Sequence, residues 1–321
     1  MKRLVFTFCF LCTFMVWSSA QQEINNTQFM YNKLGYNPGY AGTQESTTLS
    51  LIYRNQWLGI EGSPQLQLLN FQVPLANQSI GIGANINRFT VGITESITAT
   101  GMYAYRFKIR NGHVGVGISG SFRSLKNNYA DSRLVATQDR DLDQAIPLTQ
   151  QQKFLFNFGS GVYYQGQIFY IGVSAPRLLQ NNIDFADNDV FLSREIQHFY
   201  LMGGVNVPLN DEETLALQPQ FLIRYVNNAP LDADVNLSLM IQEKYIAGVT
   251  YRMGGSSESG FGESIDVLLS AQLSPIVLFG VSYDITLSEL RTYNTGSIEA
   301  LLRFSFGGQN ETNDLVSPRF F

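Results

Sequence analysis

The sequence predicts an all-β protein, a transmembrane antiparallel β-barrel of about 14 strands with both termini in the periplasm. Three observations lead to this prediction. Segments of about ten residues alternate apolar and polar side chains throughout residues 47–306, which is the period of half-buried strands. The connections between the segments are short and long in turn, as in outer-membrane barrels. A segment with the features of a secretory signal precedes them all.

Residues 1–20 have the composition of a signal peptide. The basic residues Lys2 and Arg3 precede an apolar run over residues 4–17, and Ala20 is a small residue at the expected cleavage position. The apolar run is shorter than the ~20 residues of a membrane-spanning helix, so an uncleaved anchor is the less favoured alternative. We therefore predict an exported protein in the outer membrane of a Gram-negative bacterium.

The composition excludes several other classes. Cys9 and Cys12 are the two cysteines of the chain and both lie in the predicted signal peptide, so the mature chain can form neither a disulfide nor a cysteine metal site. The net charge of −5 becomes −7 when Lys2 and Arg3 are removed, and we expect no nucleic-acid partner. The mature chain has no second apolar run long enough for a spanning helix. Since only helices and closed barrels satisfy the backbone in lipid, a barrel is the remaining solution.

The strands follow from the alternation, which is clearest over residues 97–108. There Ile97, Tyr103 and Tyr105 are expected to face lipid, whereas Ala104 and Arg106 are expected to face the lumen. The predicted strands are 49–54, 68–73, 80–87, 97–108, 114–122, 154–164, 168–175, 199–207, 215–225, 235–241, 245–252, 265–273, 277–285 and 298–306.

The connections orient the predicted barrel. The tight turns are residues 76–78, 111–112, 166, 210–213, 242–244 and 274–275, and the long loops are residues 125–152, 176–195, 254–263 and 286–296. If the short side is periplasmic, as is usual, both termini are periplasmic. The predicted organisation is a signal peptide (1–20), an N-terminal periplasmic or lumenal segment (21–46), the barrel (47–306) and a periplasmic C-terminal tail (307–321).

Charged side chains within predicted strands are tolerable only toward the lumen or near a rim. This applies to Arg54, Arg106, Arg123, Arg224 and Arg252. We expect some of these guanidinium groups to pair with Asp266 or Asp284 and to brace the barrel.

A literal G-x-G-x-x-G occurs at Gly115, Gly117 and Gly120. A dinucleotide site of this type needs a strand before the glycines and a helix after them. Here the glycines lie inside an alternating strand, so we predict no nucleotide cofactor.

An acidic run in the longest loop begins like a calcium-binding loop. Asp139, Asp141 and Asp143 have the initial spacing, but Gln144 stands where the turn glycine belongs and Gln150 where the bidentate glutamate belongs. We favour solvated acidic loops and predict no metal. The alternative is a looser Ca²⁺ site that these three aspartates form together with Asp184, Asp187 and Asp189 of the next long loop.

The sequence predicts no catalytic residue. The two histidines, His113 and His198, lie beside a predicted turn and near a strand end, and a nucleophile needs a base within hydrogen-bond reach. A barrel hydrolase built on His198 is the less favoured alternative to a non-enzymatic protein.

Several ordered motifs resemble one family. The sequence QFMYN at residues 28–32, followed by LGYNPGYAG at residues 34–42, is similar to the N-terminal signature of the PorP/SprF family of type IX secretion system outer-membrane proteins. YRNQWLGIEGSP at residues 53–64 resembles that family's Y-R-x-Q-W-x-G-x-x-G-x-P. The similarity continues in residues 197–209, 221–230, 283–290 and 317–321. The motif residues are Asn37, Pro38, Tyr40, Ala41, Gly42, Arg54, Gln56, Trp57, Gly62, Pro64, Pro318 and Arg319.

The chain departs from the family pattern at two places. Gly39 and Ser63 stand where the family often has alanine. Both are small residues, so the turns are expected to be kept.

The resemblance implies a non-enzymatic outer-membrane barrel that helps export a secreted protein or attach it to the cell surface by binding its C-terminal domain, in some members in gliding motility. It implies partners among surface adhesins with a type IX C-terminal domain and among translocon or periplasmic scaffold components, besides outer-membrane lipid. Candidate partner-binding residues in the long loops are Tyr129, Asp139, Asp141, Phe185 and Phe191. The alternative is a passive porin or a hydrophobic-solute transporter, since a lumen of about 14 strands can hold a ligand.

Two segments outside the barrel have open locations. The N-terminal motif is expected either at the periplasmic mouth or inside the lumen as a partial plug, with a turn at Asn37 and Pro38. The polar tail, which ends in Pro318 and Arg319 followed by two phenylalanines, is expected to dock a periplasmic component as a short peptide or to be a frayed terminus.

Overall fold

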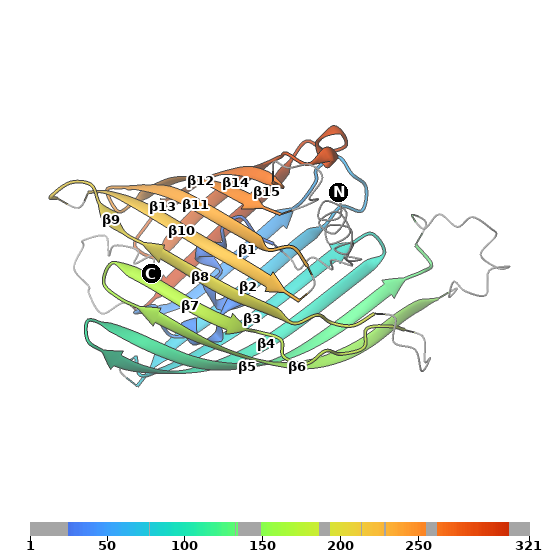
Figure 1. The fold of residues 1–321 in the computed structure, drawn as a ribbon, viewed down its shortest axis with the longest axis horizontal. Coiled ribbons are helices and arrows are strands. Elements are labelled where there is room, and N and C mark those ends of the chain that lie inside the picture. The colour runs from blue at the N-terminus through green and yellow to red at the C-terminus, as the bar shows by residue number, and fades with distance from the viewer. Residues whose placement is uncertain are drawn as a thin grey trace, which may run out of the picture.

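The computed structural model describes residues 25–76, 78–131, 133, 149–185, 193–212, 214–227, 229–254 and 262–307. Over these residues the strands form one closed antiparallel barrel (Figure 1). The predicted signal peptide and the tail from residue 308 onward lie outside the described residues.

The barrel strands have the alternating composition that the sequence analysis used. Their bounds are β1 (Thr47–Asn55), β2 (Gln65–Leu75), β3 (Ile80–Val91), β4 (Thr94–Ile109), β5 (Gly112–Asn128), β6 (Gln150–Gln165), β7 (Phe169–Ala175), β8 (His198–Val205), β9 (Val207–Pro208), β10 (Leu215–Val226), β11 (Asp232–Ile241), β12 (Tyr245–Met253), β13 (Ser264–Gln272), β14 (Val277–Thr286) and β15 (Ser297–Phe306).

Each strand pairs with its neighbours along the chain, and β1 pairs with β15 to close the barrel. The short strand β9 continues β8, because both pair with β10 in one register, with Gly204 opposite Gln220 and Val207 opposite Leu217. The described residues therefore form 14 barrel strands, as predicted.

The interruption between β8 and β9 has a local cause. Between the paired positions, β10 carries Gln218 and Pro219. Proline has no backbone N–H to donate to the ladder, so the pairing stops there and resumes at Leu217. Pro219 is itself exposed on the outer face.

The two ends of the barrel differ in their connections. One end, called the turn end, has tight connections such as Arg110–Asn111 and residues 242–244, and the first strand begins and the last strand ends there. Arg110 in the two-residue connection, and Gln242 and Glu243 in the three-residue connection, adopt positive φ angles near 51°, which are typical of tight hairpin turns. The opposite end, called the loop end, carries residues 56–64, 129–149, 176–197, 254–263 and 287–296.

The predicted loop bounds need one correction. Strand β5 continues to Asn128 and β6 begins at Gln150, so the first long loop comprises residues 129–149 and not residues 125–152. The extension was not predicted because the strand ends are polar. The alternation of apolar and polar residues stops where the strands leave the apolar layer.

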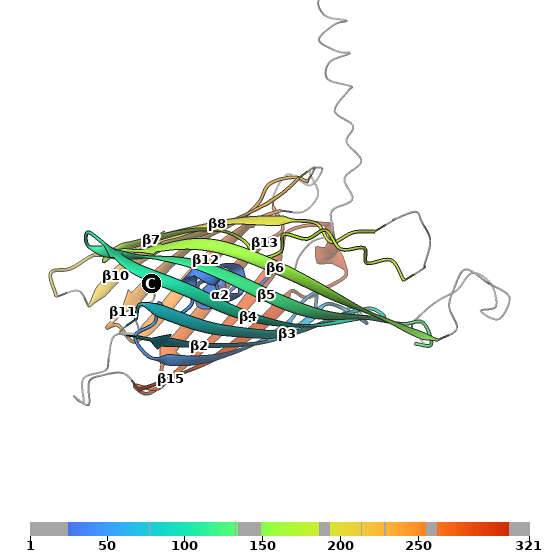
Figure 2. The same ribbon diagram turned by 90° about the horizontal axis from the view of Figure 1, so that it is seen from below.

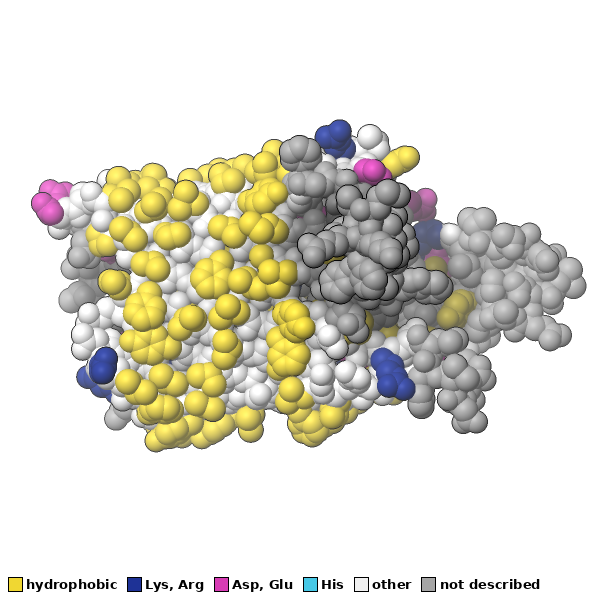
Figure 3. Space-filling model, in the orientation of Figure 1, with side chains coloured by type: hydrophobic (Ala, Val, Ile, Leu, Met, Phe, Trp, Pro, Cys, Tyr) yellow, Lys and Arg dark blue, Asp and Glu magenta, His cyan; other side chains and the backbone are white. Residues whose placement is uncertain are grey.

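The outer face is apolar. Ile97, Tyr103, Tyr105 and Phe107 are exposed on β4, whereas Arg106 between the last two is buried, as predicted. Figure 3 shows hydrophobic side chains spread over the strands and charged side chains near the two ends of the barrel. This is the surface that a strand barrel presents to lipid.

The lumen contains the N-terminal segment. Residues 25–46, called the plug, comprise η1 (Phe29–Tyr31), α2 (Lys33–Tyr36) and η2 (Pro38–Tyr40), and almost all of them are buried. Figure 2 shows α2 enclosed by the strands. Of the two locations expected for this segment, the structure has the lumenal one. Within the described part of the chain, no helix is long and apolar enough to cross a bilayer.

A lipid-facing charge tests this arrangement. Ile118 is 61% exposed in the middle of the apolar face of β5, so we expect Ile118→Lys to lower the free energy of unfolding by about 2–4 kcal/mol, the cost of a lysine at the bilayer midplane. The measurement is denaturant unfolding of the protein folded into lipid vesicles.

The matched control is Ser124→Lys on the same face of β5, past Phe122 at the end of the apolar run. There the expected cost is about 0–1 kcal/mol. Equal losses for the two variants would contradict the assignment of this face to lipid.

Candidate functional site

The first part of the plug is held by carboxylates of the barrel wall. The backbone N–H groups of Thr27 and Gln28 each donate to one oxygen of Glu299, at 2.9 Å in both cases. The Thr27 hydroxyl donates to Asp284 at 2.7 Å. Hydrogen bonds to ionised acceptors are stronger than neutral ones, so the plug is anchored firmly to β14 and β15.

Arg54 of the second family motif joins this anchor. Its Nη2 lies 2.5 Å from Asp284 Oδ2, and its Nη1 lies 3.4 Å from Glu299 Oε2 and 2.9 Å from the Thr27 hydroxyl. Arg54, Asp284 and Glu299 are at most 2% exposed. The guanidinium group thus helps to neutralise two buried carboxylates, of which Asp284 also lies 3.6 Å from Arg252, and it connects the second motif to the start of the plug.

The ionic network continues around the same wall. Arg252 lies 3.0 Å from Asp234 and 3.4 Å from Asp266, and Arg224 forms a two-pronged pair with Asp234 at 3.0 Å for both oxygens. The predicted pairing of strand arginines with Asp266 and Asp284 is therefore confirmed, while Asp234 and Glu299 were missed. Their signal in the sequence was a carboxylate at an inward position of a strand.

The end of the plug is held by close backbone packing on the opposite wall. The Asn37 side chain accepts from Gly39 N at 2.8 Å, which caps η2, and donates to the carbonyls of Val162 on β6 and Val173 on β7, at 3.0 and 3.2 Å. The predicted turn at Asn37 and Pro38 is therefore the start of η2.

Glycines of the wall make this packing feasible. A Cβ added to Gly117 would lie 2.3 Å from the carbonyl carbon of Pro38, and one added to Gly161 would lie 2.2 Å from Asn37 Oδ1. A Cβ on Gly81 would lie 2.0 Å from the Ala41 carbonyl oxygen. No side chain larger than hydrogen fits at these three positions.

This contact accounts for the apparent nucleotide motif. Gly115 and Gly117 face the plug, whereas a Cβ on Gly120 would meet nothing within 4 Å. Two of the three motif glycines thus serve plug packing. The signal in the sequence was glycine at alternate, inward positions of one strand.

Arg106 fixes the last turn of the plug. Its Nη1 donates to the Gly42 carbonyl at 2.5 Å and to the Gln78 carbonyl at 3.2 Å. Gly42 has a φ of +71° and approaches Gly81 closely, so this motif glycine is required both by conformation and by space.

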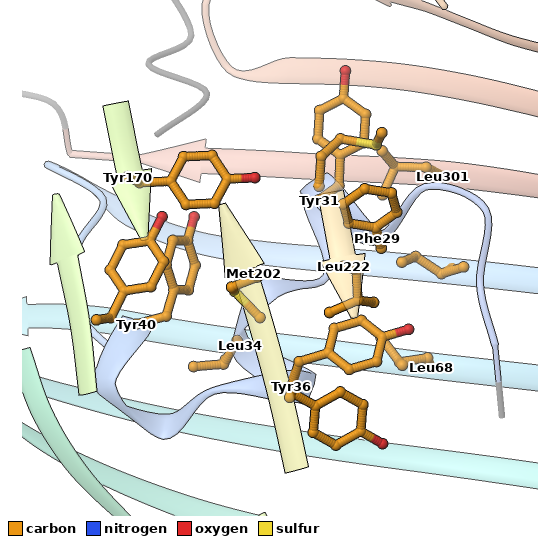
Figure 4. Close-up of a cluster of buried hydrophobic side chains, with 14 of the residues drawn as sticks. Phe29, Tyr31, Leu34, Tyr36, Tyr40, Leu68, Tyr170, Met202, Leu222 and Leu301 are labelled. Atoms are coloured by element: carbon orange, nitrogen blue, oxygen red, sulfur yellow. The ribbon is translucent and has the colours of Figure 1, made fainter. Parts of the chain in front are cut away.

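Between its two anchors the plug packs through aromatic and aliphatic side chains. Figure 4 shows Phe29, Tyr36 and Tyr40 of the plug beside side chains of the barrel wall. The Tyr36 and Tyr200 ring centroids lie 5.3 Å apart, and the Tyr40 and Tyr163 centroids 5.1 Å. The plug therefore has its own core with the barrel.

Lys33 lies in this core. Its Nζ lies 3.7 Å from the centroid of the Tyr170 ring. Burial, and then the charge of Arg303, hold the pKa of the Lys33 amine well below its ordinary value.

The second family motif also shapes the loop end. Trp57 has a φ of +54°, and its N–H donates to the Ser297 hydroxyl at 3.1 Å. Leu58 exchanges backbone hydrogen bonds with the β14–β15 connection, and the Gly62 carbonyl accepts from Gly92 at 2.8 Å. The motif therefore joins three loop-end connections, while Gln56 N donates to the Pro64 carbonyl to close its own loop.

The predicted partner-binding residues are not brought into one described site. Tyr129 and Phe185 are half-buried in two different connections of the loop end. Asp139, Asp141, Asp143 and Phe191 lie outside the described residues, as do Pro318 and Arg319. Within the described ranges, no group of three or more His, Cys, Asp or Glu side chains has the geometry to hold a metal ion.

The two histidines lie in different surroundings. His198 is buried, with Nδ1 at 2.9 Å from the Ile196 carbonyl oxygen, and its ring stacks on Tyr200 at 6.3 Å between centroids. His113 faces Lys108 across the β4–β5 pair.

Cavities remain on both sides of the plug. The space between the plug and the loop end is about 100 Å³, beside Asn26, Leu34 and Tyr200. A larger cavity of about 650 Å³ opens at the turn end. A third, of about 310 Å³, lies at the loop end beside Glu95 and Lys126.

Comparison with known proteins gives the class. The family model for the type IX secretion system membrane protein PorP/SprF matches residues 18–304. The chain belongs to this family, and it is an outer-membrane β-barrel of a Gram-negative bacterium. The match includes the plug and the barrel. No curated protein matches the chain.

Solved structures of other proteins are similar to the chain at low identity. The CymD monoaromatic hydrocarbon channel has a TM-score of 0.50 at 11% identity, covering 88% of this chain and 93% of its own. Omp33 of Acinetobacter baumannii has a TM-score of 0.48 at 8% identity, covering 81% and 99%. A FadL homologue of Pseudomonas aeruginosa has a TM-score of 0.46 at 12% identity, covering 89% and 95%.

A single methyl group tests the glycine contact. We expect Gly117→Ala to displace η2 from the wall, because the new Cβ would lie 2.3 Å from backbone atoms of Pro38. Proteolytic cleavage within residues 25–46 and ion conductance in liposomes should both rise. Gly120→Ala on the same strand is the control, and it should behave as the wild type since its Cβ meets nothing within 4 Å. A Gly117→Ala protein with an uncleaved plug and unchanged conductance would rule out the proposed tight fit.

Removing one charge tests the ionic anchor. Arg54→Met leaves Asp284 and Glu299 buried with a partner missing, so we expect the free energy of unfolding in vesicles to fall by about 3–5 kcal/mol.

Arg88→Met provides the comparison, because the Arg88–Glu95 pair at 2.5 Å is exposed and such pairs contribute about 0–1 kcal/mol. Similar losses at positions 54 and 88 would mean that the buried network does not anchor the plug.

Proposed function

We propose that this barrel is a non-enzymatic component of type IX secretion that helps export a secreted protein, or attach it to the cell surface, by binding its C-terminal domain. Family membership supports the secretion role. A surface adhesin used in gliding motility is one cargo of this class. The observation that carries the proposal is the plug, which fills the lumen and leaves the two ends of the barrel for contacts with partners.

The filled lumen favours an adaptor over a passive porin or a hydrophobic-solute transporter. The cavity beside Asn26, Leu34 and Tyr200, on the loop-end side of the plug, has a volume of about 100 Å³, whereas ordinary ligand pockets occupy about 300–1,000 Å³. The plug is anchored on two opposite walls, by Glu299 on one side and by the glycines around Pro38 on the other. A continuous solute path would require both anchors to open.

The loop end is the proposed site of cargo contact. With the turn end in the periplasm, as is usual for such barrels, the long connections face outward. Tyr129 and Phe185 are half-buried there, and Asp139, Asp141 and Phe191 belong to the same connections. A few aromatic anchors surrounded by polar residues are the usual source of affinity in protein interfaces.

The turn end is the proposed site of contact with translocon or periplasmic scaffold components. The last strand ends there at Phe306, so residues 307–321 with Pro318 and Arg319 begin at this rim. A short peptide of this kind is suited to docking in a partner groove. The contact roles proposed for both ends require neither a bound cofactor nor a catalytic group.

The test is affinity purification of the tagged protein from native outer membranes, with identification of the proteins that co-purify. We expect a large secreted protein with a C-terminal sorting domain together with type IX components. Replacing residues 129–149 by a short Gly-Ser linker, which leaves β5 and β6 intact, should remove the cargo and keep the periplasmic components.

The complementary variant lacks residues 308–321, and it should keep the cargo while losing the periplasmic components. The control is replacement of residues 227–231, the short connection between β10 and β11. Recovery of the barrel alone, with a large steady conductance in liposomes, would favour a solute channel.

A further inference from the structure

The cavity at the turn end has a basic wall. Its volume is about 650 Å³, and its lining includes Arg106, Lys108 and Arg110 from β4 and the turn that follows, together with His113 from β5 and Arg303 from β15. Glu45 at the end of the plug is the acidic residue of the lining. This excess of positive charge contrasts with the net charge of −5 of the chain.

Three of these side chains have no acidic partner among the described residues. Arg106 and Arg303 are occupied by backbone carbonyls of Gly42 and Tyr31. Lys108, Arg110 and His113 form no ion pair within the described ranges, unlike the lumenal arginines of the ionic network. His113 is neutral at pH 7, so Lys108 and Arg110 are the cationic groups of the site that lack an ion pair. Cationic groups that outnumber the carboxylates of a concave site create a potential that attracts anions.

The direction of these side chains narrows the class of ligand. Arg106 and Lys108 occupy inward positions of β4, while the residues before, between and after them, Tyr105, Phe107 and Ile109, occupy the lipid-facing positions. The basic groups therefore face the mouth of the barrel and not the surrounding bilayer. A lipid headgroup would have to enter the mouth of the barrel to contact Arg106 and Lys108.

Their spacing suits an extended chain. Arg106 and Lys108 are alternate residues of a strand and so are about 6.6 Å apart along it, and Arg110 continues toward the rim. Carboxylates at alternate positions of an extended peptide have the same repeat. A single small anion would use only one or two of these groups.

The remaining walls offer hydrogen-bond partners for a peptide backbone. Amide side chains of Gln165, Asn206, Gln218 and Gln272 line the same cavity. Amides provide both donors and acceptors, which is the complement of peptide N–H and C=O groups.

We propose that the turn-end cavity is a binding site for an acidic, extended segment of a partner protein. Lys108 and Arg110 form ion pairs with the carboxylates of this segment, and Arg106 lies at the inner end of the site. The site lies at the opposite end from the proposed cargo contact. This proposal is therefore independent of the role proposed for the loop end.

The experiment uses the full-length barrel folded in detergent micelles and a fluorescent acetyl-(Asp-Ser)₄-amide peptide at low ionic strength. We expect saturable binding that weakens as salt is raised. Lys108→Gln combined with Arg110→Gln should raise the Kd at least tenfold. The matched control combines Lys126→Gln and Arg291→Gln at the loop end, and it should leave the Kd unchanged. Retention of the folded, heat-modifiable form on gels verifies that both proteins are intact.

Three outcomes would overturn the proposal. The first is equal binding by the wild type and the Lys108 and Arg110 variant. The second is equal affinity for the neutral peptide acetyl-(Asn-Ser)₄-amide. The third is displacement of the acidic peptide by inorganic phosphate or phosphatidylglycerol vesicles at matched charge concentration, which would identify a small-anion or lipid site. The variant with residues 129–149 replaced should bind the peptide like the wild type, so failure of the cargo proposal is distinguishable from failure of this one.

Discussion

The structure depends on one constraint, which is that a barrel of 14 strands encloses more space than its own inward side chains can fill. Closure is required because lipid supplies no hydrogen-bond partners for a strand edge, and closure at this strand number creates a wide lumen. The plug fills that lumen. The burial of Phe29, Leu34 and Tyr36 is thus a consequence of the size of the barrel.

The two walls hold the plug by different physical means. On the side of β14 and β15, buried charged groups neutralise one another, because an unpaired charge is unfavourable in a buried site. Thr27 lies within this network. On the side of β5 and β6, the absence of a side chain at Gly117 lets the plug backbone approach the wall, and the absence of one at Gly161 makes room for the Asn37 side chain. The ionic hydrogen bonds fix the orientation of the groups that they join. The glycine positions accept only a segment that fits closely against the strands. Together they define one position for the plug.

Because the plug occupies the lumen, we propose contacts with partner proteins at the two ends of the barrel. The second family motif illustrates this, because Arg54 reaches inward to the plug while Trp57 and Gly62 bind neighbouring connections of the loop end. The same short motif therefore contacts both the plug and the connections of the loop end. At the opposite end, Arg106 contacts the plug at Gly42 and lines the basic cavity. At each end of the barrel, at least one residue that holds the plug therefore also contributes to the local structure.

The sequence by itself determined the barrel, its number of strands, the inward and outward faces and the alternation of tight and long connections, because a strand repeats every two residues and lipid selects one face. It also indicated that Arg54 and Arg252 need carboxylate partners. Only the tertiary structure decided that the plug is lumenal, that Glu299 anchors it, that Gly115 and Gly117 serve packing, and that Lys108 and His113 meet at one mouth. These contacts join residues up to 272 positions apart, and such distant pairings leave no local periodicity in a sequence.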